Sequence, residues 1–195
     1  NPELALLDLS VGDPTAYGNL RVPDEVLDAA VDVLRGRAHN GYAPSYGLAA
    51  AREAVAARYS LPTAPLTPDD VVMTAGTSGA IELAIGALAN AGQSVLMARP
   101  GFPLFRTLAE GMGVRVGYYD LRPDAGWEVD LDSLAAAVDD TTAAVIVNNP
   151  SNPCGCVYSA AHLAAIAAVV GASHRPTAPA RQAMVGRADA CRRGH

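Results

Sequence analysis

The segment NNPSNPCG, residues 148–155, has the residue types and the position of a ligand-binding turn. It directly follows an apolar run at residues 143–147, which predicts a buried strand. Two X-Pro steps restrict the backbone around Asn152, so its side-chain amide is held in place and can donate a hydrogen bond to a ligand oxygen. Because Asn-Pro turns are also common as plain structure, this turn becomes a candidate site only together with other loops.

A second loop, TAGTSGA at residues 74–80, lies between a predicted strand and a predicted helix. Its small residues would let the backbone N–H groups of Gly76, Thr77 and Ser78 approach a phosphate at the helix N-terminus. The same residue types also cap ordinary helices, so this alternative stays open. The loop has neither GxGxxG nor GxxxxGK[ST] spacing, which disfavours a dinucleotide-binding or P-loop enzyme.

A third loop, RPGFPLF at residues 99–105, follows the next predicted strand and contains Phe102. An aromatic side chain at this place can lie flat on a planar ligand ring, although a plain core position is the alternative. Because the carboxyl ends of parallel strands meet at one edge of a sheet, the three loops are expected to converge there.

The elements that must position these loops alternate between strands and helices from residue 71 onward. This alternation predicts an α/β fold with a parallel-type sheet and flanking helices. The predicted strands are residues 71–74, 94–98, 114–120 and 143–147. The predicted helices are residues 23–34, 48–59, 78–90, 103–111, 131–138 and a last one that Ser159 caps and that runs to residue 170.

Composition narrows the possible functions. The chain has 195 residues and a net charge of −6, which gives no electrostatic support for binding nucleic acid or an acidic membrane. It lacks an apolar run long enough to span a bilayer, and no signal peptide is visible after Asn1, so we expect a soluble protein that acts on small polar metabolites.

Three Cys residues, an odd number, indicate reduced thiols and a cytoplasmic location. The Cys154–Cys156 pair lacks partners at zinc-site spacing, so no metal site is expected.

Seven motifs, taken in order, resemble those of class I, fold-type I pyridoxal-phosphate-dependent aminotransferases, and within that class the tyrosine aminotransferases. They are LSVGDP (9–14), YGNL (17–20), NGYAPSYG (40–47), TAGTSGAIELAI (74–85), RPGFPLFRTLAEGMG (99–113), WEVDL (127–131) and NNPSNPCG (148–155). The resemblance spans residues 9 to about 170. It implies a homodimeric enzyme that uses pyridoxal 5'-phosphate to move an amino group from an aromatic amino acid such as tyrosine to a 2-oxo acid.

The resemblance also assigns site residues. It implies that Gly76, Thr77 and Ser78 hold the cofactor phosphate, that Phe102 stacks on the pyridine ring, and that Asn152 hydrogen-bonds the phenolic oxygen of that ring. These roles agree with the chemistry of the three loops.

Two more roles follow from the resemblance alone. Tyr42 is expected to reach the cofactor phosphate of the partner subunit, and Gly12 to place its backbone beside the substrate carboxylate. The alternative for Tyr42 is an ordinary aromatic residue in a turn, and the alternative for Gly12 is a simple bend of the backbone. The sequence departs mildly from the family pattern, with Thr77 where Cys is frequent, Gly79 where Gln is usual and Cys156 where Ser is usual.

The resemblance further implies an incomplete large domain. We expect residues 1–60 to form an N-terminal arm and helices leading into this domain, and residues 61–170 to form part of it. Residues 171–195 hold five Arg and one acidic residue, Asp189, without periodic apolar positions, which predicts a disordered basic tail. An RNA-binding tail is the alternative, disfavoured because aromatic residues and a repeated motif are absent.

The chain contains no Lys, and all 14 of its basic residues are Arg. The family pattern continues beyond residue 170 with the Lys that holds the cofactor covalently, and residues 171–195 offer no position for it. Arg cannot replace this Lys, because its guanidinium stays protonated at any working pH. We therefore expect a truncated and catalytically inactive chain. A fragment that binds the cofactor phosphate or dimerises with an intact subunit is one alternative, and an unrelated Rossmann-like binding protein is another, which the ordered motifs disfavour.

Overall fold

The computed structural model of the chain describes residues 12, 13, 15, 18 and 20–173. The chain divides between Val72 and Met73 into two compact units, and each unit is described by itself. Within the described residues, no helix combines the length and the apolar character that crossing a membrane requires. The predicted basic tail lies almost entirely outside the described residues, as does most of the LSVGDP and YGNL motifs.

The first unit contains two α-helices, α1 (Asp24–Gly36) and α2 (Ala49–Tyr59), and the short 3-10 helix η1 (Pro68–Asp70). Both predicted helices are confirmed. Helix α1 begins directly after Pro23, whose fixed φ suits a helix start, and ends where Arg37 adopts a left-handed conformation. No residue of α1 is buried, and Leu34 is 72% exposed.

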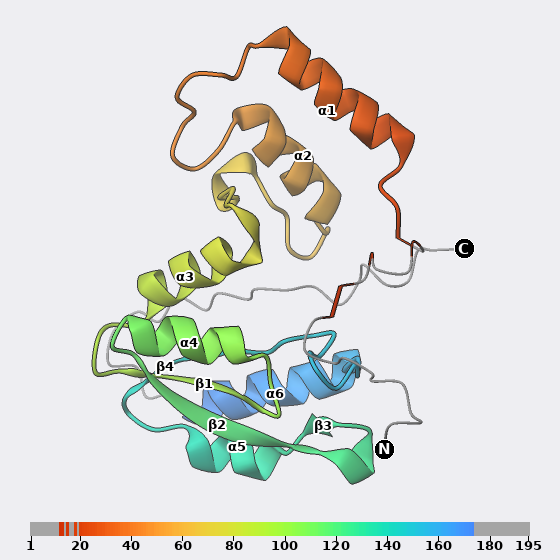
Figure 1. Cartoon of the computed structure of the whole chain (residues 1–195). Helices are drawn as coiled ribbons and strands as arrows, with labels where there is room; N and C mark the ends of the chain where they lie inside the picture. The colour runs from red at the N-terminus through yellow and green to blue at the C-terminus, as the bar shows by residue number, and fades with distance from the viewer. Residues whose placement is uncertain (1–11, 14, 16–17, 19, 174–195) are drawn as a thin grey trace, which may run out of the picture. The chain divides into compact units, whose positions relative to one another are not determined.

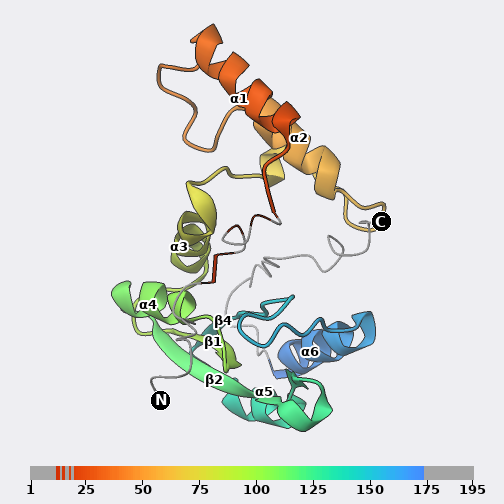
Figure 2. The same cartoon turned by 45° about the vertical axis from the view of Figure 1, so that its right-hand side comes forward.

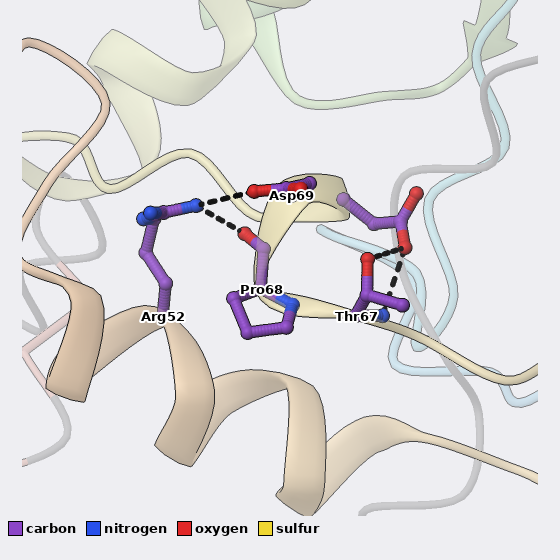
Figure 3. A network of polar contacts seen from close by, with 5 residues as sticks. Arg52, Thr67, Pro68 and Asp69 are labelled. Carbon is purple, nitrogen blue, oxygen red and sulfur yellow. Dashed lines mark hydrogen bonds and ion pairs between the residues drawn. The ribbon is translucent and has the colours of Figure 1, made fainter.

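Arg52 of α2 ties this helix to the Pro-rich connector that follows it (Figure 3). Its Nη1 donates to the carbonyl oxygen of Pro68 at 2.6 Å and lies 3.4 Å from Oδ1 of Asp69. The guanidinium carbon also lies 4.5 Å from the centre of the Tyr46 ring, within cation–π range. Arg52 is 9% exposed, and these partners offset part of the cost of burying its charge, because its Nε is buried without a hydrogen-bond partner.

The second unit is built on a four-stranded sheet with strand order β3-β2-β1-β4. Strand β1 (Ser94–Arg99) pairs in parallel with β2 (Arg115–Arg122) and with β4 (Thr142–Val145). The two-residue β3 (Glu128–Val129) adds to β2 in the antiparallel direction. The helices of this unit are α3 (Gly76–Leu88), α4 (Pro103–Gly111), the 3-10 helix η2 (Pro123–Ala125), α5 (Leu131–Ala137) and α6 (Ala160–Ser173). The predicted α/β fold is confirmed.

Helices cover both faces of the sheet (Figures 1 and 2). Successive side chains of a strand point to opposite faces, so Val95 of β1 packs among residues of α3 and α4, whereas Leu96 packs among residues of α5 and α6. The core on the α5 and α6 side contains Leu96, Tyr119, Leu121, Val129, Leu134, Tyr158 and Ile166. The predicted cap of α6 is also confirmed, since Ser159 Oγ accepts the N–H of His162 at 3.1 Å.

The predicted strand at residues 71–74 is wrong. Val71 has the extended dihedral angles of a strand, φ −120° and ψ 126°, but within the described part of the chain no strand pairs with this segment. Val72 and Met73 are 57% and 39% exposed. Apolar β-branched residues favour extended backbone, but a strand also needs a hydrogen-bonded neighbour.

Candidate functional site

The loops that follow β1 and β4 leave the sheet at the same edge, because the two strands are parallel. They line one shared depression in the second unit. The first loop and helix α4 contribute Gly101, Phe102 and Phe105, and the second loop contributes Asn148, Ser151 and Asn152. The structure thus brings together two of the predicted site residues, Phe102 and Asn152.

Phe102 is held at the point where β1 turns into α4. It is the residue before the first turn of α4, which begins with Pro103. Its ring packs edge-to-face on Phe105, with 5.8 Å between ring centres and an interplanar angle of 88°. Gly101 is required in this turn, because a Cβ there would collide with the carbonyl oxygen of Ala98. The rings of Phe102 and Phe105 are both partly exposed at this edge of the sheet.

The loop that carries Asn152 is held by hydrogen bonds within the loop. The side-chain oxygen of Asn148 accepts the backbone N–H of Asn152 at 3.1 Å, and its side-chain nitrogen donates to the carbonyl of Pro150 at 3.3 Å, in the amide orientation that satisfies both atoms. Ser151 is 9% exposed and donates its N–H to the carbonyl of Cys156 at 2.9 Å. The side chain of Asn152 itself is exposed, so its amide is available to a ligand.

Helix α3 has an open N-terminus. Gly76, its first residue, has φ +75°, a conformation that favours glycine, and Thr77 and Ser78 are exposed beside it. No side chain caps this end, and the first N–H groups of a helix have no partner within the helix. The N–H of Gly76 donates to the carbonyl of Thr74 at 3.0 Å, so the N–H groups that this end offers to an anion are those of Thr77 and Ser78. This end belongs to the same unit as the depression, although residues 76–78 are not among those that line it.

The remaining predicted site residues, Tyr42 and Gly12, belong to the first unit. Tyr42 lies in the turn before α2, and its side chain is fully exposed. Gly12 is exposed as well, and a Cβ built on it would meet nothing within 4 Å. Neither residue belongs to the depression that Phe102 and Asn152 share.

Of the residues that line the depression, sequence reasoning singled out only Phe102 and Asn152 and missed, among others, Gly101, Asn148 and Ser151. Gly101 could have been suspected from its place between a strand and a proline-started helix, where the backbone turns sharply. Asn148 and Ser151 flank Asn152, but nothing in the residue types says which of the polar side chains faces a ligand and which ones hold the loop. Across the described residues, no group of three or more His, Cys, Asp and Glu could hold a metal ion, and Cys154 and Cys156 are free thiols.

Comparison with known proteins identifies the family. Residues 5–177 match the family model for class I and II aminotransferases. The chain belongs to this family. It is 52% identical over 169 residues to tyrosine aminotransferase from Mus musculus, covering 87% of this chain and 37% of that protein. The Homo sapiens tyrosine aminotransferase is 50% identical over the same length and the same shares.

Solved aminotransferase structures share the fold. The crystal structure of tyrosine aminotransferase from Leishmania infantum superimposes with a TM-score of 0.80 at 39% identity, covering 85% of this chain and 46% of that chain. The chain therefore spans less than half of the length of the aminotransferases that it matches. The part of the chain that matches the family includes both loops of the depression and the start of α3.

Proposed function

We propose that the chain forms the cofactor-binding part of a pyridoxal-phosphate-dependent aminotransferase that moves the amino group of an aromatic amino acid such as tyrosine to a 2-oxo acid. The observation that carries this proposal is the depression at the carboxyl edge of the sheet, which Phe102 and Asn152 share. The 52% identity to a tyrosine aminotransferase supports the substrate class. When bound, pyridoxal phosphate supplies a reactive aldehyde and an electron-accepting ring.

The residue types at this edge fit the cofactor, whose ring would lie over the depression, because the enclosed space there is only about 10 Å³. Phe102, steadied by Phe105, offers a flat apolar surface for a pyridine ring. Asn152 offers an exposed amide that can donate to the phenolic oxygen. The open N-terminus of α3, with Gly76 in the left-handed region, offers backbone N–H groups and the positive end of the helix dipole to a phosphate.

Two further roles fall to residues of the first unit and rest on the family resemblance alone. We assign to Tyr42, whose side chain is fully exposed, the contact with the partner's cofactor phosphate in a homodimer. To Gly12 we assign the backbone position beside the substrate carboxylate. The predicted boundaries at residues 60 and 170 and the cytoplasmic location remain predictions.

A second candidate function rests on the absence of Lys. Transamination needs an amine that holds the cofactor and then moves a proton, and the guanidinium groups of this chain are too basic for both tasks. We propose that the chain by itself binds the cofactor without a covalent bond and does not transaminate. An inactive binding or dimerising fragment is therefore the alternative to an active enzyme.

Replacing Asn152 with Ala is expected to weaken pyridoxal phosphate binding by about tenfold, because one hydrogen bond to a charged oxygen is lost. Isothermal titration calorimetry of the 195-residue chain measures this. The matched control is Asn90→Ala, in the loop that precedes β1 and hence at the opposite edge of the sheet. It should leave the affinity unchanged. The proposed function is wrong if the unsubstituted chain shows no saturable binding, and the role of Asn152 is wrong if both variants bind alike.

A further inference from the structure

A buried tyrosine reaches the base of the Asn152 loop from two strands away. Tyr119 of β2 is 1% exposed, and its hydroxyl donates to the carbonyl oxygen of Ile146 at 2.7 Å. In the sheet, β1 lies between β2 and β4, and Ala98 of β1 is the register partner of Tyr119. Register partners point to the same face, so the tyrosine side chain passes over the small Ala98.

Ile146 is the residue at which the chain leaves β4. Its N–H still bonds the carbonyl of Leu96 on β1 at 2.8 Å, although β4 ends one residue earlier. Ile146 also lines the depression, and Asn148, two residues further on, accepts the backbone N–H of Asn152. Ile146 is thus held by hydrogen bonds to both β1 and β2 at the place where the strand ends and the loop begins.

The hydroxyl of Tyr119 is a permanent donor. Burial raises the pKa of this phenol well above its ordinary value, so it stays protonated at any working pH. A phenylalanine would fill the same place in the core on the α5 and α6 side. What the hydroxyl adds to the packing of the ring is therefore its hydrogen bond to the Ile146 carbonyl. Removing this donor would leave a buried carbonyl without a partner, which lowers stability.

We propose that Tyr119 is a positioning residue for the cofactor site: through the Ile146 carbonyl it fixes the start of the loop at residues 148–155 and hence the place of Asn152 opposite Phe102. The inference deepens the proposed function and rests on it for its link to pyridoxal phosphate. Tyr119 is not among the residues that line the depression, and its hydroxyl bonds a backbone carbonyl, so we expect it to act through the backbone.

The first test needs no cofactor. Hydrogen exchange measured by mass spectrometry should show the amides of residues 147–157 exchanging about tenfold faster in Tyr119→Phe than in the unsubstituted chain. Tyr118→Phe is the matched control, because it removes a hydroxyl from the adjacent residue of β2, on the other face of the sheet. It should leave the exchange of this loop unchanged. Equal loop exchange in Tyr119→Phe and the unsubstituted chain would overturn the inference.

The second test links the hydroxyl to the cofactor. Pyridoxal phosphate should bind about tenfold more weakly to Tyr119→Phe, and the double variant Tyr119→Phe/Asn152→Ala should bind no more weakly than Asn152→Ala. Additive losses would show a general structural role and overturn the inference. If the unsubstituted chain does not bind the cofactor, the proposed function fails, and the exchange measurement still decides whether Tyr119 positions the loop.

Discussion

Replacing Ser78 with Asp is expected to weaken pyridoxal phosphate binding by at least about 100-fold without destabilising the chain. A carboxylate in the first turn of α3 repels a phosphate at the same helix end, and two like charges about 4 Å apart near a surface cost about 4 kcal/mol. The same carboxylate interacts favourably with the helix dipole, by about 0.3–1 kcal/mol. Affinity and stability should therefore change in opposite directions, as calorimetric titration and thermal unfolding can show.

The chain provides a matched control for this substitution. Ser159 lies at the N-terminus of α6, in the same unit, and Ser159→Asp adds the same charge to another helix start. This variant should bind the cofactor as the unsubstituted chain does. If Ser78→Asp also retains full affinity, the phosphate is not held at α3, and the role assigned to Gly76, Thr77 and Ser78 is wrong.

Replacing Leu134 with Ala is expected to lower the free energy of unfolding by about 3 kcal/mol. Leu134 is 0% exposed and belongs to the core that joins α5 and α6 to the sheet. Truncation there removes buried apolar surface and leaves a cavity. Urea unfolding followed by circular dichroism measures the change, provided that the transition is two-state.

The control for Leu134 deletes the same atoms at an exposed position. Leu83 of α3 is 56% exposed, so Leu83→Ala should change the free energy of unfolding by less than about 1 kcal/mol. A loss for Leu134→Ala no larger than that for Leu83→Ala would mean that the core on the α5 and α6 side is not packed as described.

Local sequence signals predicted most of the elements. Helix α4 occupies the predicted residues, because Pro103 starts it and glycines follow its apolar stripe. The alternation of strands and helices predicts the parallel arrangement, and this arrangement places the loops of Phe102 and Asn152 at one edge of the sheet. Strand β3 was missed because two residues give too short a pattern to detect.

The rest depends on contacts that no local pattern contains. The failed strand at residues 71–74 shows that apolar, β-branched residues predict extended backbone but not a neighbour to pair with. The reach of Tyr119 across β1 depends on strand order and on the small size of Ala98, which spacing along one strand does not reveal. The roles of Tyr42 and Gly12 rest on family resemblance alone.

The central claim is that the loops at the carboxyl edge of this sheet, together with the start of α3, bind pyridoxal phosphate. A crystal structure of the chain grown with this cofactor tests it most directly. We predict the pyridine ring against Phe102, the phenolic oxygen within hydrogen-bonding distance of the Asn152 amide, and the phosphate at the start of α3, on the N–H groups of Thr77 and Ser78. Cofactor bound elsewhere, or density that leaves this edge empty at saturating cofactor, would contradict it.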